Sequence, residues 1–292
     1  SKCVAIGTNA LLAQEPASAL DMYNVAIGYN AGAAITSGID NTLIGALAGD
    51  AITSSSQNVA LGSSALSALT IGTANVALGY RTLFASVDGD HNTAVGYKAL
   101  EDYEDGDGNG HNTAIGSKSQ LNASTGEFNT SLGSLSMGVG VTTGDYNVAV
   151  GYRAGEDITS TTTSTLIGAF AGYSMTSGAN NTAIGYAALA TEDTYGHNTA
   201  IGYAALNLLN AGADAYNVAI GSSAGVAMTT GTLNTLVGGR AGDAITSGHS
   251  STALGYAALS TEDTSSHNTA IGSGAMASGQ NAAKNVAVGN NT

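Results

Sequence analysis

The chain has 292 residues, of which 10% are charged, with seven Lys and Arg, 21 Asp and Glu, no Trp and a formal net charge of −14. This acidity argues against a nucleic-acid partner and against binding to anionic membrane surfaces, because both depend on basic side chains. The 41 glycines lie in register and proline occurs once, which argues against Pro/Gly-rich disorder. No apolar run approaches ~18 residues and no leader peptide is evident, so we expect no membrane insertion.

A pentapeptide of the type Asn-Thr/Val-Ala-Ile-Gly recurs seventeen times, always with glycine in fifth place, and twelve of the sixteen gaps between these glycines equal 17 residues. A unit this short cannot bury an apolar face alone and has to stack on its copies. We therefore predict an all-β parallel β-solenoid of about 17 coils, with residues 1–292 as a single domain. Representative repeat positions are Asn24, Ile27, Gly28, Asn41, Ile44, Gly45, Asn181, Ile184, Gly185, Asn198, Ile201 and Gly202.

Each repeat, numbered from its Asn, begins with a predicted short strand over places one to six. Place two is Val or Thr and place four is Ile, Leu or Val, which is an alternation of period two. Asn fills place one in fourteen repeats, with Cys3, Ser164 and Ser251 as the exceptions. Stacked coils would align these amides in a ladder with steps of ~4.8 Å. Alternatively, the Asn only begins a turn.

The side chains at places nine and twelve compensate each other in volume, which defines two types of coil. Six repeats have Gly at place nine and a large aliphatic residue three positions later, as at Gly32 and Ile35. Other repeats have Leu at place nine, and place twelve is then free to be Tyr103 or Glu192. A close-packed interior demands such compensation. We predict that places nine and twelve face one core.

Longer gaps between repeats predict loops on one face, at residues 8–20, 101–110, 137–146 and 207–216. The second of these contains Asp105-Gly106-Asp107-Gly108-Asn109-Gly110, which matches the first half of a calcium-binding loop. The Glu expected at its twelfth place is missing, because Gly116 stands there. Asp105, Asp107 and Asn109 are therefore the candidate Ca²⁺ ligands, and a solvated acidic turn is the alternative. We expect no other cofactor.

Histidines and tyrosines recur at fixed places. His91, His111, His197 and His267 come directly before the Asn of a repeat, and the first two belong to neighbouring coils. They lack the carboxylates or thiols of a zinc site, so they are interpreted as corner residues. The tyrosines at place six could offer faces to sugars, but stacking between coils is the favoured interpretation. They are Tyr29, Tyr80, Tyr97, Tyr152, Tyr186, Tyr203 and Tyr256.

The residues also bear on two further function classes. A polysaccharide-degrading spike would use carboxylate pairs such as Glu192-Asp193 or Glu262-Asp263, but these pairs recur as a duplicated surface turn would. We expect no catalytic residues and no enzyme. An ice-binding solenoid would need the place-two Thr residues as a flat exposed array. Their irregular alternation with Val indicates a half-buried wall instead.

The segment Asn181-Thr182-Ala183-Ile184-Gly185-Tyr186-Ala187-Ala188-Leu189 resembles the seventeen-residue repeats of phage tail-fibre and bacterial surface-fibre proteins, which often end in an endosialidase-type chaperone. Asn24 to Gly28 is more distantly similar to the head repeat of trimeric autotransporter adhesins. The resemblance implies a left-handed β-roll type of solenoid, displayed outside the cell on a virion or cell surface. It further implies a homotrimer that attaches to a glycan or protein receptor or serves as a rigid spacer. Here the coils are longer than in the adhesin heads.

Overall fold

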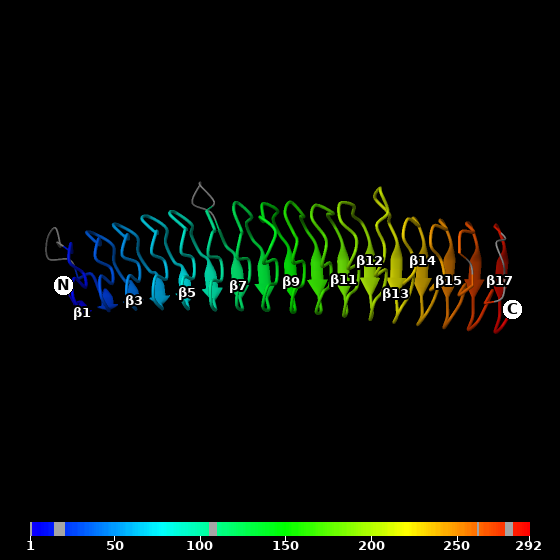
Figure 1. Ribbon diagram of the computed structural model, residues 1–292, viewed down its shortest axis with the longest axis horizontal. Coiled ribbons are helices and arrows are strands. Elements are labelled where there is room, and N and C mark those ends of the chain that lie inside the picture. The colour runs from blue at the N-terminus through cyan, green and yellow to red at the C-terminus, as the bar shows by residue number, and fades with distance from the viewer. Residues whose placement is uncertain (1, 15–20, 105–109, 262, 278–282) are drawn as a thin grey trace. The chain divides into compact units, whose positions relative to one another are not determined.

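A computed structural model describes residues 2–14, 21–104, 110–261, 263–277 and 283–292 of the chain. It divides into two compact units, residues 1–146 and 147–292, each of which is described by itself. The described residues form short parallel strands, one in each repeat, and contain no helix (Figure 1). The predicted all-β parallel solenoid is thereby confirmed, whereas a single domain over 1–292 stays a prediction.

The described residues of the first unit form eight strands, each paired in parallel with the next along the chain. Every residue pairs with the residue of the same place in the next repeat, as Ile27 does with Ile44. The strands are β1 Val4–Ile6, β2 Val25–Ile27, β3 Thr42–Ile44, β4 Val59–Leu61, β5 Val76–Leu78, β6 Thr93–Val95, β7 Thr113–Ile115 and β8 Thr130–Leu132.

In the part of the second unit that the structure describes there are nine strands with the same register, so that Ile184 pairs with Ile201. A repeat of 19 residues separates β12 from β13 without disturbing this register, because the surplus is placed in the turn. The strands are β9 Val148–Val150, β10 Thr165–Ile167, β11 Thr182–Ile184, β12 Thr199–Ile201, β13 Val218–Ile220, β14 Thr235–Val237, β15 Thr252–Leu254, β16 Thr269–Ile271 and β17 Val286–Val288.

The strands are shorter than the predicted places one to six, and both ends have a local cause. Gly in fifth place adopts φ values between 127° and 147°, which residues with a side chain rarely adopt, and this turns the chain out of the strand. At the other end, the backbone N–H of the Asn donates to the side chain of the Asn one repeat earlier. Asn41 N, for example, lies 2.9 Å from Asn24 Oδ1. Backbone pairing therefore starts at place two.

The Asn side chains form the predicted ladder inside the coils. Each Asn from Asn24 to Asn268 that stands in first place is at most 1% exposed. Besides accepting from the next repeat, the amide in most repeats donates to a carbonyl in the turn about 14 residues later, as Asn24 Nδ2 does to Gly38 O at 2.7 Å. Ser164 keeps the acceptor role, because Asn181 N donates to its Oγ at 3.2 Å. The ladder thus supplies partners to backbone groups that water cannot reach.

Places one, three, eight, nine and twelve line the core of each unit, so the prediction for places nine and twelve is confirmed. Ile35, Leu100 and Tyr103 are all fully buried. Place three, mostly Ala, is also fully buried in β2 to β16, and it is Leu in three repeats. A Cβ on Gly32 or Gly49 would lie 2.9 Å from a terminal methyl of Leu43. One place-three Leu therefore fills the space left by two glycines in neighbouring coils.

Candidate recognition surfaces

The side chains at places two and four of the strands form the outer strand face of each unit. Strand alternation puts these side chains on the side opposite the buried places one and three. Large aliphatic side chains remain substantially exposed here, for instance Leu61 at 49%, Leu132 at 46% and Leu254 at 47%. The Thr and Val at place two are half-buried or exposed on the same face. An apolar ladder thus follows each stack of strands on its outside.

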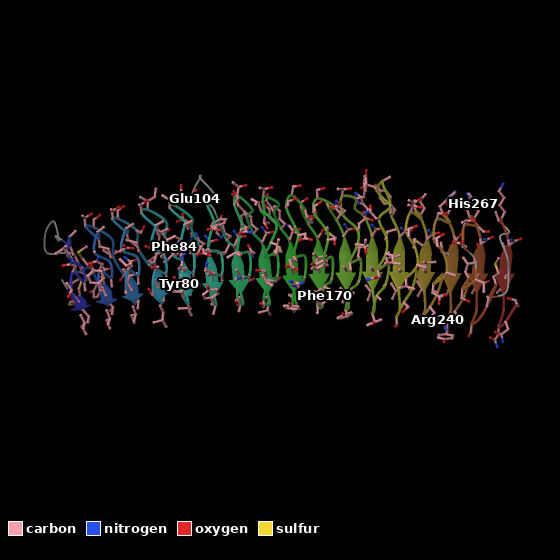
Figure 2. The ribbon with its side chains drawn as sticks, viewed as in Figure 1. Tyr80, Phe84, Glu104, Phe170, Arg240 and His267 are labelled. Carbon is pink, nitrogen blue, oxygen red and sulfur yellow. The ribbon has the colours of Figure 1, made fainter. Side chains whose placement is uncertain are left out.

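The place-six tyrosines follow the corner glycine and form a row at the carboxyl ends of the strands. Tyr80 stacks on Tyr97 with ring centroids 5.7 Å apart, and Tyr186 stacks on Tyr203 at 5.5 Å. Figure 2 shows Tyr80 in the first unit, and Phe170 and Arg240 in the second, beside the strand ends of their own units. Stacking between coils, the favoured interpretation, is confirmed for these two pairs.

A second aromatic row lies at the last place of the repeat, directly before the Asn. In the first unit His91, His111, Phe128 and Tyr146 stack in sequence with centroid distances of 4.8, 5.0 and 5.1 Å and nearly parallel planes. All four adopt positive φ, between 55° and 60°. His91 and His111 are therefore adjacent, as their spacing suggested, and they belong to an aromatic stack at a corner.

The segment 207–216 protrudes between β12 and β13 at the edge away from the carboxyl ends of the strands (Figure 1). A Cβ on Gly212 would meet nothing within 4 Å, so the tip of this loop is open to solvent. Asp214 Oδ1 accepts from Gly196 N at 3.1 Å, and its Oδ2 lies 3.9 Å from His197 Nε2. The His197 ring stacks on Tyr216 at 4.7 Å. These contacts fix the base of the loop.

Glu192 lies inside the coil and is fully buried. Its two carboxylate oxygens accept from Tyr195 N and Ala211 N, each at 3.3 Å. Burial raises the pKa of Glu192 to about 7, although these backbone N–H groups and that of Asp193 lower it. The carboxyl group connects the core to the protruding loop and does not face the solvent. Its predicted counterpart Glu262 lies outside the described residues.

The candidate Ca²⁺ ligands Asp105, Asp107 and Asn109 also lie outside the described residues. Within the part of the chain that the structure describes, no group of three or more His, Cys, Asp or Glu side chains could hold a metal ion. The calcium site therefore stays a prediction.

No protein-family model and no curated protein matches this chain. Fibre and adhesin assignments accordingly depend on the residues themselves and on the resemblance described above. A search of the described residues finds no helix that is long and apolar enough to cross a membrane.

Sequence reasoning found the tyrosines, the histidines and the long loop, but it did not find the outer strand face. The alternation of places two and four does not say which side of the strand is inside. The signal that could have decided it is place three, which is Ala in nearly every repeat and is replaced by a larger Leu only beside coils with Gly at place nine. A place whose side-chain size depends on glycines in its own and neighbouring coils has to face the core.

Proposed function

We propose that this chain is a structural and adhesive fibre segment on the surface of a virion or a cell, assembled as a homo-oligomer through its outer strand face. A trimer is the assembly that the resemblance favours. The observation that carries the proposal is the ladder of exposed aliphatic side chains on that face, which a monomer would leave in water.

The chemistry of the face fits self-association, and its size is that of a functional surface patch. Nine strands at ~4.8 Å spacing and about 10 Å of strand length make a flat area of roughly 430 Å² in the second unit. Contiguous apolar patches of roughly 300–600 Å² on a monomer are often functional. The place-two and place-four side chains are uncharged in every repeat, so copies of a chain with net charge −14 can meet there without carboxylates opposing each other.

Different parts of the coil suit the two roles of rigid spacer and attachment surface. In-register strands and the buried Asn ladder stiffen the stack, which suits a spacer. The protruding segment 207–216 offers an exposed tip on a fixed base, which suits recognition of a glycan or protein receptor. Each alternative function has its own assay. A polysaccharide-degrading spike would release reducing ends from capsular polysaccharide, and an ice-binding solenoid would produce thermal hysteresis.

Analytical ultracentrifugation tests the assembly with a matched pair of charge substitutions. Leu254→Lys places a charge on the outer strand face, where Leu254 is 47% exposed. Leu233→Lys places it directly before an Asn, outside that face, where Leu233 is 57% exposed. We expect the unchanged chain and Leu233→Lys to sediment as the same oligomer. Leu254→Lys should need about tenfold higher concentration to assemble, because an unpaired charge is costly in an apolar interface. A one-chain mass for the unchanged protein at micromolar concentration, or equal behaviour of the two variants, would refute the proposed interface.

A further inference from the structure

The row of place-six side chains in the second unit has an interval without rings between Tyr203 and Tyr256. Ser222 and Gly239 occupy place six in the two intervening coils. Backbone hydrogen bonds fix the register of all four residues, namely Ser223 N to Tyr203 O at 2.8 Å, Arg240 N to Ser222 O at 2.8 Å and Ala257 N to Gly239 O at 2.9 Å. The two tyrosines therefore stand three coils apart, about 14 Å along the stack.

The two rings bordering this interval are the most exposed of the place-six tyrosines. Tyr203 is 59% exposed and Tyr256 is 60% exposed, against 47–55% for the other five. One face of Tyr203 is covered by Tyr186 in a nearly parallel stack. Its other face is directed toward the coil of Ser222, whose side chain is too small to cover it. An aromatic face next to a hydroxyl group is thus left open.

Tyr256 leans into the interval from the opposite side. A Cβ on Gly239 would lie 3.5 Å from Tyr256 Cδ2, so the ring rests beside the bare backbone of this glycine. The interval between the two rings is therefore somewhat smaller than the three coil spacings that separate their backbones.

Arg240 supplies hydrogen-bond donors at the rim of the interval. Its Nε lies 2.8 Å from Asp243 Oδ2, and its guanidinium group also interacts with the Tyr256 side chain. More than half of the Arg240 side chain is exposed (Figure 2). The guanidinium group is therefore held beside the Tyr256 ring while donors still face the solvent.

We propose that Tyr203, Ser222, Gly239, Arg240 and Tyr256 form a binding site for one pyranose ring of a surface glycan. A pyranose has two faces of C–H groups that pack on aromatic rings and a rim of hydroxyl groups that need polar partners. The face of Tyr203 that Tyr186 leaves open would contact one face of the pyranose. Arg240 and Ser222 would bond its hydroxyl groups, and Tyr256 would border the site and hold Arg240 in place. The site rests on the proposed adhesive function and gives it a ligand class and a position apart from the loop 207–216.

Saturation-transfer NMR tests the site with methyl glucoside, methyl galactoside and methyl glucuronide as probes. Ser222→Tyr fills the interval with the residue that seven other repeats carry at place six, so the variant should fold. Ser273→Tyr adds the same side chain at place six of the coil beyond Tyr256 and is the matched control. We expect at least one probe to bind the full chain at about 10 mM, and Ser222→Tyr to weaken this binding at least about tenfold while Ser273→Tyr does not.

Two further variants separate the parts of the site. Tyr203→Ala should weaken every bound probe, whereas Arg240→Gln should weaken the glucuronide most because it removes the only positive charge among the five residues. Failure of all three probes to bind the full chain, or equal binding by Ser222→Tyr, would overturn the site. Retained sedimentation as an oligomer and retained adhesion to cells would then leave the proposed fibre function standing, so the two failures are distinguishable.

Discussion

Replacing one Asn of the buried ladder should destabilise its coil, and the loss should depend on whether the new side chain can still accept a hydrogen bond from the next repeat. Asn234 is fully buried, receives Ser251 N on its Oδ1 at 3.0 Å and donates from Nδ2 to Gly248 O at 2.9 Å. Asn234→Ala leaves the Ser251 N–H and the Gly248 carbonyl without partners. Since each buried unsatisfied group costs about 1–3 kcal/mol, we expect a loss of about 2–6 kcal/mol.

Asn234→Ser is the informative control, because the chain itself uses Ser at place one. A hydroxyl can accept from Ser251 N as Ser164 accepts from Asn181 N, so only the Gly248 carbonyl loses its partner. We expect a loss of about 1–3 kcal/mol, roughly half that of the Ala variant.

Both variants should be measured by urea unfolding together with hydrogen exchange at the Ser251 amide, because repeat arrays can open locally. The Ala variant should accelerate exchange at Ser251 far more than the Ser variant. Equal stabilities and equal exchange rates would refute the argument that the ladder stabilises the coil by satisfying buried backbone groups.

Two further predictions concern the corner glycine and the buried carboxyl group. Gly255→Ala should lower the free energy of unfolding by about 2–6 kcal/mol in thermal unfolding, because φ is 138° and the new Cβ would lie 2.5 Å from Gly272 O. Gly212→Ala is the control: φ is 71° there and the Cβ would meet open space, so the loss should be only about 1–2 kcal/mol. The pKa of Glu192 is raised from 4.5 to about 7, because burial favours the protonated carboxyl group in the folded chain. Its contribution to the free energy of unfolding is therefore fully present below pH 4.5, and up to about 3 kcal/mol of stability is lost as the pH rises through 7. Urea unfolding at pH 5 and pH 8 should show a smaller pH difference for Glu192→Gln; an unchanged difference would contradict this assignment.

The fold was predictable because the chain contains many copies of one repeat, and comparing these copies shows which places share a structural role. The 17-residue spacing indicated stacking, and the exchange of volume between places nine and twelve identified core positions such as Ile35 and Leu100. A strand ladder with identical residues in register then follows, because only that arrangement lets Ile27 and Ile44 meet.

Other features could not be predicted, because they depend on backbone conformation that residue type does not specify. Leu100 and His91 adopt positive φ, although neither residue type favours it, because the coil has to turn there. The apolar outer strand face was likewise hidden, since Ile and Val at place four look like core residues until the buried place-three Ala is seen. Among the candidate sites, the tyrosine row was visible in sequence, but the lean of Tyr256 toward Gly239 was not.

The register of the Asn ladder across β12 and β13 also bears on how such chains change length. Asn217 N donates to Asn198 Oδ1 at 3.2 Å although 19 residues separate them, so surplus residues are expelled into the turn while the ladder continues. Unequal genetic crossover between two Asn codons would consequently delete or duplicate whole coils and keep the Asn ladder in register. Coil number could thereby vary wherever the exchanged coils carry matching residues at places three and nine.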